Sequence, residues 1–218
     1  MTGGDALDRL VGVAGDLLAR VDGTLAGFGA PADHPVWPLL SRLRTLPGEA
    51  VGALAAATAA PLATAGGVLR LLQREYAHAR AALPAAPGWR GAGADAFAGQ
   101  WGALGAHLDS ASPDDLAGRL AATTSYVDDL AGWLAELRAA VARTLAVVVI
   151  SAEAVRVRTA ADPVAAADIA ACLLATLADG WERGERLRGR CGTGLGELVY
   201  RAPDPPVLSR DAHTVVPL

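Results

Sequence analysis

A long apolar stripe in the middle of the sequence limits the fold more than any other feature. Between Leu116 and Val155, apolar residues recur in alternating steps of three and four, the spacing that places side chains on one face of an α-helix. The stripe consists of Leu116, Leu120, Thr123, Val127, Leu130, Leu134, Leu137, Val141, Leu145, Val148, Ala152 and Val155. β-branched and aromatic runs, which indicate strands, are nearly absent outside residues 147–150. The sequence therefore predicts an all-α protein.

The same spacing recurs on both sides of this stripe. Predicted helices cover residues 5–28, 39–46, 48–84 and 164–187, with a loop at 29–38, a kink at Pro61, a helix restart at Ser112 and a cap at Asp162 before Pro163. The expected inward positions are Leu7, Val11, Ala14, Leu18, Val21, Leu25 and Phe28 in the first helix, Leu62, Ala65, Leu69, Leu72 and Tyr76 in the third, and Ile169, Leu173, Leu177 and Trp181 in the last. The length of the third helix favours an elongated antiparallel bundle of four to five helices over residues 1–189. An extended tail, residues 190–218, follows because its glycines and prolines interrupt the pattern.

The charge pattern argues against a nucleic-acid partner. All basic residues are arginine, which we attribute to GC-rich codon usage, and the net charge is -4. Nucleic-acid binding needs clustered cationic charge, whereas the densest arginine group, residues 183–190, is interleaved with Glu182 and Glu185. We therefore expect no binding to nucleic acid.

The sequence lacks the usual marks of a Sec-type signal peptide or a membrane span. Its N-terminus has neither a basic region nor a continuous apolar core. The longest strongly apolar run, residues 145–150, is far shorter than the ~20 residues that a spanning helix needs. We expect no transmembrane segment, so export would require a route that is independent of a signal peptide.

Residues able to catalyse reactions or hold metals are scattered along the chain. The four histidines, His34, His78, His107 and His213, fall on different segments, so a metal site would need several segments to converge. The glycine-rich residues 192–196 lack the lysine of a phosphate-binding loop. We predict no enzyme activity, no cofactor and no metal. Cys172 lies among apolar residues and is expected to be buried, and whether it pairs with Cys191 is left open.

A short proline- and glycine-rich stretch separates two predicted helices. Pro87 cannot continue a helix, and Gly91 allows backbone angles that a side chain would forbid. Trp89 lies between two glycines, where its ring can close the apolar end of a helical hairpin. Phe97 and Trp101 then begin a new helical face. We predict that the chain reverses direction at this stretch.

Trp89-Arg90-Gly91, followed by small residues and Phe97, resembles the turn of the WXG superfamily, which are helical hairpins secreted by type VII (ESX-type) systems. The resemblance covers about residues 50–110 and implies a hairpin around 48–110, in a longer single-chain relative of that family. It implies a non-enzymatic protein that associates through helices with itself or another small helical protein. A secretion ATPase is the second implied partner, and Trp89, Gly91, Phe97 and Trp101 are the implied recognition residues. The implied location is outside the cell or on its surface.

The family also uses a C-terminal export element of the form Tyr-x-x-x-Asp/Glu. Tyr200 and Asp204 match this pattern, but Pro203 disfavours the helical context that the element resembles in known substrates. Direct export is therefore in doubt, and a partner could supply the signal instead. The alternative interpretation is a cytoplasmic helical scaffold or chaperone for a neighbouring gene product.

Overall fold

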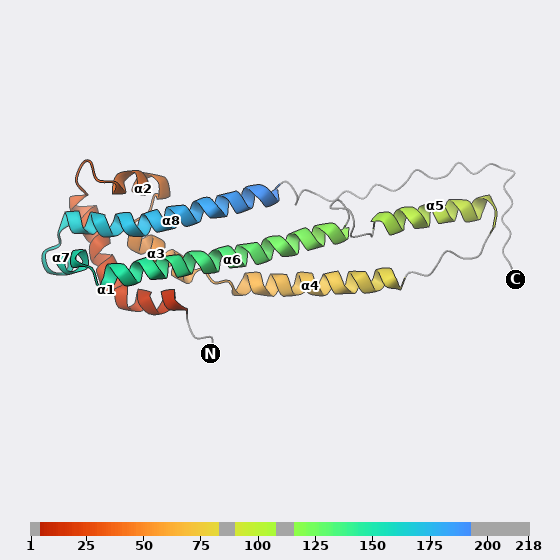
Figure 1. Ribbon diagram of the computed structural model, residues 1–218, viewed down its shortest axis with the longest axis horizontal. Coiled ribbons are helices and arrows are strands. Elements are labelled where there is room, and N and C mark those ends of the chain that lie inside the picture. Colours follow the sequence, from red (N-terminus) through yellow and green to blue (C-terminus); the bar gives the residue numbers. More distant parts are fainter. Residues whose placement is uncertain (1–4, 83–89, 108–115, 193–218) are drawn as a thin grey trace. The chain divides into compact units, whose positions relative to one another are not determined.

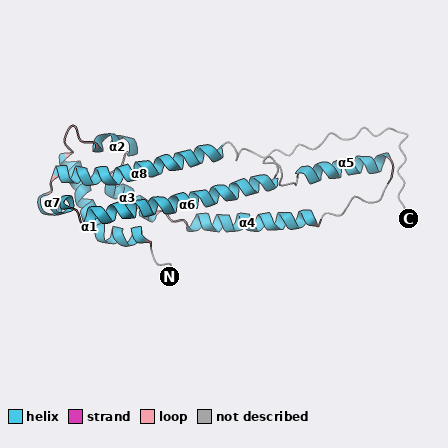
Figure 2. Ribbon diagram, in the orientation of Figure 1, coloured by secondary structure: helices cyan, strands magenta, loops and turns pink. Residues whose placement is uncertain are grey.

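The structure, a computed structural model, describes residues 5–82, 90–107 and 116–192 (Figure 1). Every regular element in these ranges is a helix, as Figure 2 shows. The helices are α1 (Ala6–Phe28), α2 (Val36–Leu43), α3 (Pro47–Ala56), α4 (Ala60–Ala81), α5 (Ala92–His107), α6 (Leu116–Val149), α7 (Ala152–Ala160) and α8 (Pro163–Gly192). The predicted all-α fold is confirmed. The predicted restart at Ser112 and residues 193–218 of the predicted tail lie outside the described residues. Residues 190–192, which were also predicted to be tail, belong to α8 instead.

The chain divides into two compact units. The first comprises Met1–Leu62 and Asp129–Arg188, and the second comprises Ala63–Asp128 and Gly189–Leu218. The first unit holds α1, α2, α3 and α7, together with most of α8 and the C-terminal part of α6. The second holds α5, most of α4 and the first part of α6. Each unit is described by itself below.

The first unit has a core of aliphatic side chains and alanines. Helix α1 contributes Leu7, Ala14, Leu17, Leu18, Val21 and Leu25, α6 contributes Leu134, Leu137, Val141, Leu145 and Val148, and α8 contributes Ile169, Leu173, Leu174 and Leu177. Helix α1 contacts both α3 and α7. Most of the predicted inward positions of α1 are therefore correct. Phe28 is an exception, since 75% of its surface is exposed where α1 ends.

Helices α6 and α8 pack side by side in opposite directions within this unit (Figure 1). The indole N–H of Trp133 donates a hydrogen bond of 2.8 Å to the carbonyl of Gly180, and the hydroxyls of Thr144 and Thr176 lie 3.0 Å apart. A Cβ atom at Gly184 would lie 2.8 Å from the Trp133 ring, and one at Gly180 would overlap Leu137. The two glycines, one helical turn apart, therefore let the bulky side chains of α6 approach the α8 backbone.

The guanidinium of Arg138 joins three helices of the first unit. It donates to both carboxylate oxygens of Asp5 at 2.7 and 3.1 Å and to Asp8 at 2.6 Å. Asp5 also caps α1 by accepting the backbone N–H groups of Leu7 and Asp8. On its other side Arg138 donates to the last carbonyls of α3 and the residue beyond, at Leu54, Ala55 and Ala57, over 2.6 to 2.9 Å. Carbonyls in the last turn of a helix lack the usual N–H partner four residues ahead, and that of Leu54 accepts the N–H of Ala57 at 3.2 Å as well. One buried side chain of α6 therefore stabilises the start of α1 and the end of α3.

This arrangement makes stability depend on pH in a predictable direction. The hydrogen bonds from Arg138 lower the pKa of Asp5 below its usual value, so the folded state binds fewer protons at Asp5 than the unfolded state does. The stability from Asp5 is present above its unfolded pKa and is lost as the pH falls towards the folded pKa. Urea titrations of the wild type and Asp5→Asn should therefore differ by a constant amount above about pH 5, and the difference should shrink as the pH falls below about 4.

Asp22 provides a control with the opposite sign. Its carboxylate accepts the N–H groups of Gly48 and Glu49 at 2.9 and 3.2 Å and so caps α3, but burial raises the pKa of Asp22. The wild type should therefore lose stability relative to Asp22→Asn as the pH rises through the raised pKa. Profiles that change in the same direction for Asp5→Asn and Asp22→Asn would contradict one of the two assignments, and the direction would show which.

Several predicted boundaries are wrong, each for a local reason. The second helix is α2 and begins at Val36, because Pro38 falls in its first turn, where a proline needs no N–H partner. The predicted long helix at 48–84 is interrupted at residues 57–59, and Pro61 lies in the first turn of α4 instead of kinking a continuous helix. The predicted cap at Asp162 is correct, since its carboxylate accepts the N–H groups of Val164 and Ala165.

Two predictions of burial on α8 are also wrong. Trp181 is 55% exposed, and Cys172 is exposed and unpaired. Cys172 and Cys191 both belong to α8, and their separation of 19 positions corresponds to about 28 Å along a helix. A disulfide requires Cα atoms within about 7 Å, so the two cysteines cannot pair within one chain while α8 is intact.

The expectation that no segment could cross a membrane is weakened. The segments Pro47–Ala81 and Pro163–Arg190 are long and apolar enough to span a bilayer by length and composition alone. The prediction missed them because alanine raises their mean hydropathy without forming one unbroken run of large apolar residues. In the second segment 56% of the apolar window is buried, as in a core helix, whereas in the first only 11% is buried.

Candidate functional site on α4

The predicted recognition residues on α5 form a compact aromatic pair. Phe97 and Trp101 stack with ring centroids 5.6 Å apart and an angle of 16° between the rings, as residues four apart on a helix can do. Gly91, just before α5, has a φ of 105°, and its carbonyl accepts the N–H of Asp95. The expectation that Gly91 adopts an angle unfavourable for other residues is confirmed. Trp89, Tyr200 and Asp204 lie outside the described residues.

In the second unit, α4 pairs with the first part of α6, and the two helices run in opposite directions. Arg70 donates to both oxygens of Asp128 at 2.9 and 3.0 Å. Ten residues further along α4, Arg80 lines a groove together with Ala117 of α6. Since residue numbers rise along α4 while they fall along α6, the pair is antiparallel.

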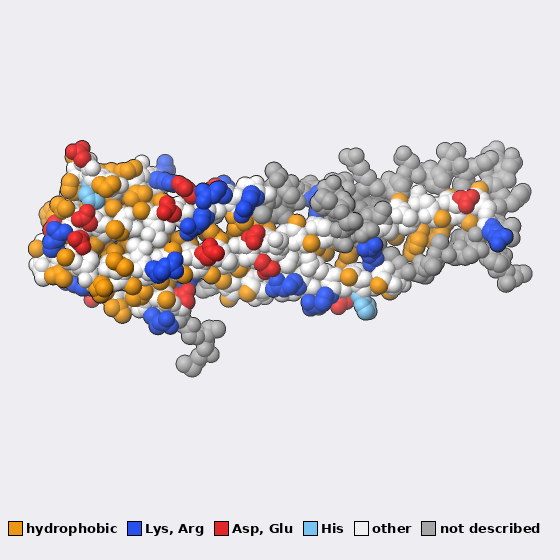
Figure 3. Space-filling view, in the orientation of Figure 1, with side chains coloured by type: hydrophobic (Ala, Val, Ile, Leu, Met, Phe, Trp, Pro, Cys, Tyr) orange, Lys and Arg blue, Asp and Glu red, His pale blue; other side chains and the backbone are white. Residues whose placement is uncertain are grey.

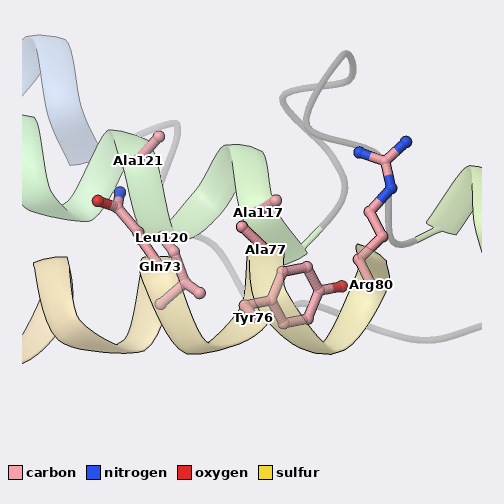
Figure 4. Close-up of a pocket in the computed structure, with 7 residues that line it drawn as sticks. All are labelled: Gln73, Tyr76, Ala77, Arg80, Ala117, Leu120 and Ala121. Carbon is pink, nitrogen blue, oxygen red and sulfur yellow. The ribbon is translucent and has the colours of Figure 1, made fainter. Parts of the chain in front are cut away.

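The groove between these helices has an apolar floor and a polar rim (Figure 4). It encloses about 200 Å³ and is lined by Gln73, Tyr76, Ala77, Arg80, Ala117, Leu120 and Ala121. The three alanines let the helices approach closely. Figure 4 shows the phenol of Tyr76 beside the side chain of Arg80, and Gln73 near Leu120.

The residues of α4 that are shielded from solvent form one narrow stripe, here called the inner stripe. It consists of Leu62, Gly66, Leu69, Gln73 and Tyr76, in steps of four, three, four and three. Every other residue between 63 and 81 is exposed. Because Gln73 and Tyr76 line the groove with α6, the inner stripe is the face of α4 that α6 covers.

A second apolar stripe on α4 is exposed, and each of its residues precedes a residue of the inner stripe by one position. This outer stripe consists of Pro61, Ala65, Val68 and Leu72, in steps of four, three and four. The exposed fractions of Val68 and Leu72 are 52% and 48%, and the neighbouring Leu71 is also 48% exposed. A shift of one residue corresponds to about 100° around a helix. The described part of α4 therefore presents two apolar faces, of which only the inner stripe is covered.

The sequence pattern located α4 but placed its seam incorrectly. Ala65 and Leu72 are exposed although they were expected to face inward, and Gly66 and Gln73 face inward in their place. The predicted seam alternated between the two stripes, because Leu62, Leu69 and Tyr76 belong to one and Ala65 and Leu72 to the other. Glycine and glutamine carry no apolar signal, so periodicity alone could not separate two adjacent stripes.

The first unit contains one histidine-carboxylate pair, and its geometry fits a structural role. The Nδ1 atom of His34 accepts the N–H of Val36 at 3.2 Å, so Nε2 carries the proton and donates to Asp168 at 3.1 Å. The pair ties the loop before α2 to α8, and Arg156 lies 3.9 Å from Asp168. No group of three or more His, Cys, Asp or Glu side chains able to hold a metal occurs among the described residues.

Exposed apolar side chains occur elsewhere on the first unit too. Figure 3 shows many of them over the helices of that unit, interspersed with charged residues. At the junction of α6 and α7, Val147 and Ile150 are 67% and 85% exposed. They do not continue into a stripe of regular spacing, so α4 remains the clearest candidate surface.

Comparison with known proteins adds no assignment. No protein-family model, curated protein or solved structure matches the chain. The described residues define an all-helical protein whose most distinctive surface is the outer stripe of α4. The resemblance to the WXG superfamily stays a prediction that depends on Trp89, Gly91 and Phe97.

Proposed function

We propose that this chain is a non-enzymatic helical interaction protein that acts by associating with other helices and resembles substrates of type VII secretion systems. The outer stripe of α4 is the observation that carries the proposal. Its spacing is that of a helix-helix seam, and half-exposed valine and leucine side chains gain free energy when a partner helix covers them. Its partners are a second copy of the chain or another small helical protein.

The secretion part of the proposal has separate support. The Trp-x-Gly sequence immediately precedes α5, and Gly91 has the positive φ expected of a glycine at a turn. The stacked Phe97 and Trp101 form an aromatic surface on α5, the helix that follows Gly91. In this proposal a secretion ATPase or a partner recognises that surface, and the chain is exported without a signal peptide. The antiparallel bundle of four to five helices is part of the same proposal.

Replacing Trp89 with alanine tests recognition separately from folding. In a host with an active type VII system, the ratio of secreted to cellular protein should fall by about tenfold or more, as expected when an aromatic anchor is removed from a recognition surface. The melting temperature should change little. Trp181→Ala is the matched control, because this exposed tryptophan lies on α8 in the other unit and its loss should leave export unchanged.

The contrary result is equally specific. A lower melting temperature with normal export would mean that Trp89 only closes the core of a hairpin. Recovery of the wild-type chain in the cell fraction alone, while other substrates are exported, would favour a cytoplasmic scaffold.

A further inference from the structure

We infer that the outer stripe of α4 is the seam of a homodimer in which α4 packs antiparallel to α4 of a second copy, with Val68 at the twofold axis. This inference rests on the proposed function, because it names the partner for helix-helix association. It is carried by the order of residue sizes and charges along the stripe. Three features of α4 lead to it.

The first feature is the position of the charges, which favours a helix over a lipid surface. Arg70 and Arg74 each follow a stripe residue by two positions, which is about 200° around the helix, so both lie on the face opposite the stripe. A helix that lies on an anionic membrane uses the basic residues of its polar face to bind headgroups, but Arg70 already pairs with Asp128 of α6. Glu75 occupies the next position of the stripe and is exposed, where it would face the anionic headgroups unfavourably.

The second feature is the alternation of side-chain size along the stripe. In an antiparallel pair with Val68 at the axis, residue 72 of one copy lies level with residue 64 of the other, so the stripe residue nearest to Leu72 is Ala65, one position away. The larger Leu72 therefore meets the small Ala65 twice, and Val68 meets Val68 at the centre. Large side chains opposite small ones fill a helix-helix seam without overlap. A twofold axis repeats each contact, as an isologous interface requires.

The third feature is the position of Glu75 in this register. Residue 75 of one copy lies opposite residue 61 of the other, in the first turn of α4. A helix N-terminus carries a partial positive charge that stabilises a nearby carboxylate. In a parallel pair the same glutamate would lie beside Glu75 of the other copy, with like charges in contact. Both size and charge therefore select the antiparallel arrangement.

Disulfide crosslinking in the full-length chain tests the register. The background is Cys172→Ser with Cys191→Ser, which removes the native thiols. Val68→Cys should form a disulfide-linked dimer under mild oxidation, because the two residues face each other at the axis. Leu72→Cys alone should not, since its copies would be about 12 Å apart along the helix axis, beyond the ~7 Å limit for a disulfide. An equimolar mixture of Leu72→Cys and Ala65→Cys should crosslink.

Analytical ultracentrifugation of variants without added cysteines tests the energetics. Val68→Arg places two like charges at the axis and should raise the dimer dissociation constant by about tenfold or more. Because Val68 is half-exposed, the variant should keep the helical circular dichroism of the wild type. Val13→Arg is the control, since Val13 is 69% exposed on α1 and its replacement should leave the dimer unchanged.

Several outcomes would overturn the inference. They are a monomeric wild-type chain at all concentrations, a Leu72→Cys dimer that forms as readily as the Val68→Cys dimer, or binding to anionic vesicles that Val68→Arg abolishes. If the chain is monomeric but captures a different helical protein through the stripe, the homodimer fails while the proposed function stands. If the dimer forms in the predicted register but Trp89→Ala is exported normally, only the proposed recognition of the Trp-x-Gly turn fails.

Discussion

Replacing Arg138 with alanine is expected to lower the free energy of unfolding by about 1.5 to 3 kcal/mol, the value of hydrogen bonds that involve a charged group, because Asp5 and Asp8 are 48% and 41% exposed and stay solvated without Arg138. The guanidinium is 8% exposed, and its five N–H groups are all directed at acceptors on α1 or at the end of α3. Its loss would remove this donor from the carbonyls of Ala55 and Ala57, and would leave that of Leu54 with only the N–H of Ala57. Guanidinium chloride denaturation at pH 7 measures this change.

Arg138→Lys is the informative companion variant. Lysine keeps the positive charge but has three N–H donors on one nitrogen. It therefore cannot donate hydrogen bonds to two carboxylates and three carbonyls at the same time. It should recover only part of the lost stability. If Arg138→Ala costs less than about 1 kcal/mol, the typical value of one ordinary hydrogen bond, then Arg138 does not hold the three helices together.

Replacing either Gly180 or Gly184 with alanine is expected to destabilise the first unit by about 1 to 3 kcal/mol, the usual cost of overfilling a packed site. An added methyl at Gly184 would meet the rigid Trp133 indole at 2.8 and 2.9 Å. At Gly180 it would overlap Leu137, which is itself buried. Alanine favours a helix more than glycine does, by up to about 1 kcal/mol. The expected loss of stability is the net change that remains after this gain.

Glycines with free space around them supply the control for this prediction. A Cβ atom added at Gly132 on α6, or at Gly189 on α8, would meet nothing within 4 Å. Gly132→Ala and Gly189→Ala should therefore raise the melting temperature, while Gly180→Ala and Gly184→Ala should lower it. The same sign at all four positions would show that α6 and α8 do not depend on close approach at Gly180 and Gly184.

The sequence-based predictions were correct where a structural feature depends on residues that are close together in the chain. The predicted ends of α1 and the cap at Asp162 are correct because a cap involves neighbours only a few residues apart. The positive φ of Gly91 followed from the need for a turn between two helices. In contrast, the exposure of Trp181 and Cys172 could not be predicted, because an apolar stripe on α8 does not reveal how far around the helix its neighbours extend.

At the candidate site, the sequence also did not show which apolar face of α4 is covered. The spacing on α4 indicated a helix with apolar residues facing a partner, and the structure divides those residues between a covered and an exposed stripe. The covered stripe includes Gly66 and Gln73, which no hydrophobic pattern would select. Comparable reasoning applies to Arg138, which follows the buried Leu137 directly and has no sequence feature that distinguishes it from the surface arginines.

The sequence by itself determined that the protein is helical, where several helices begin, and which residues are apolar enough to need burial. These properties depend on interactions within one or two helical turns. Only the tertiary structure decided which face of α4 is covered, that α6 reaches α8 through Gly180 and Gly184, and that Arg138 joins α1 to α3. Such contacts bring together residues up to 133 positions apart, and the helical period alone does not specify which of several similar apolar faces will meet.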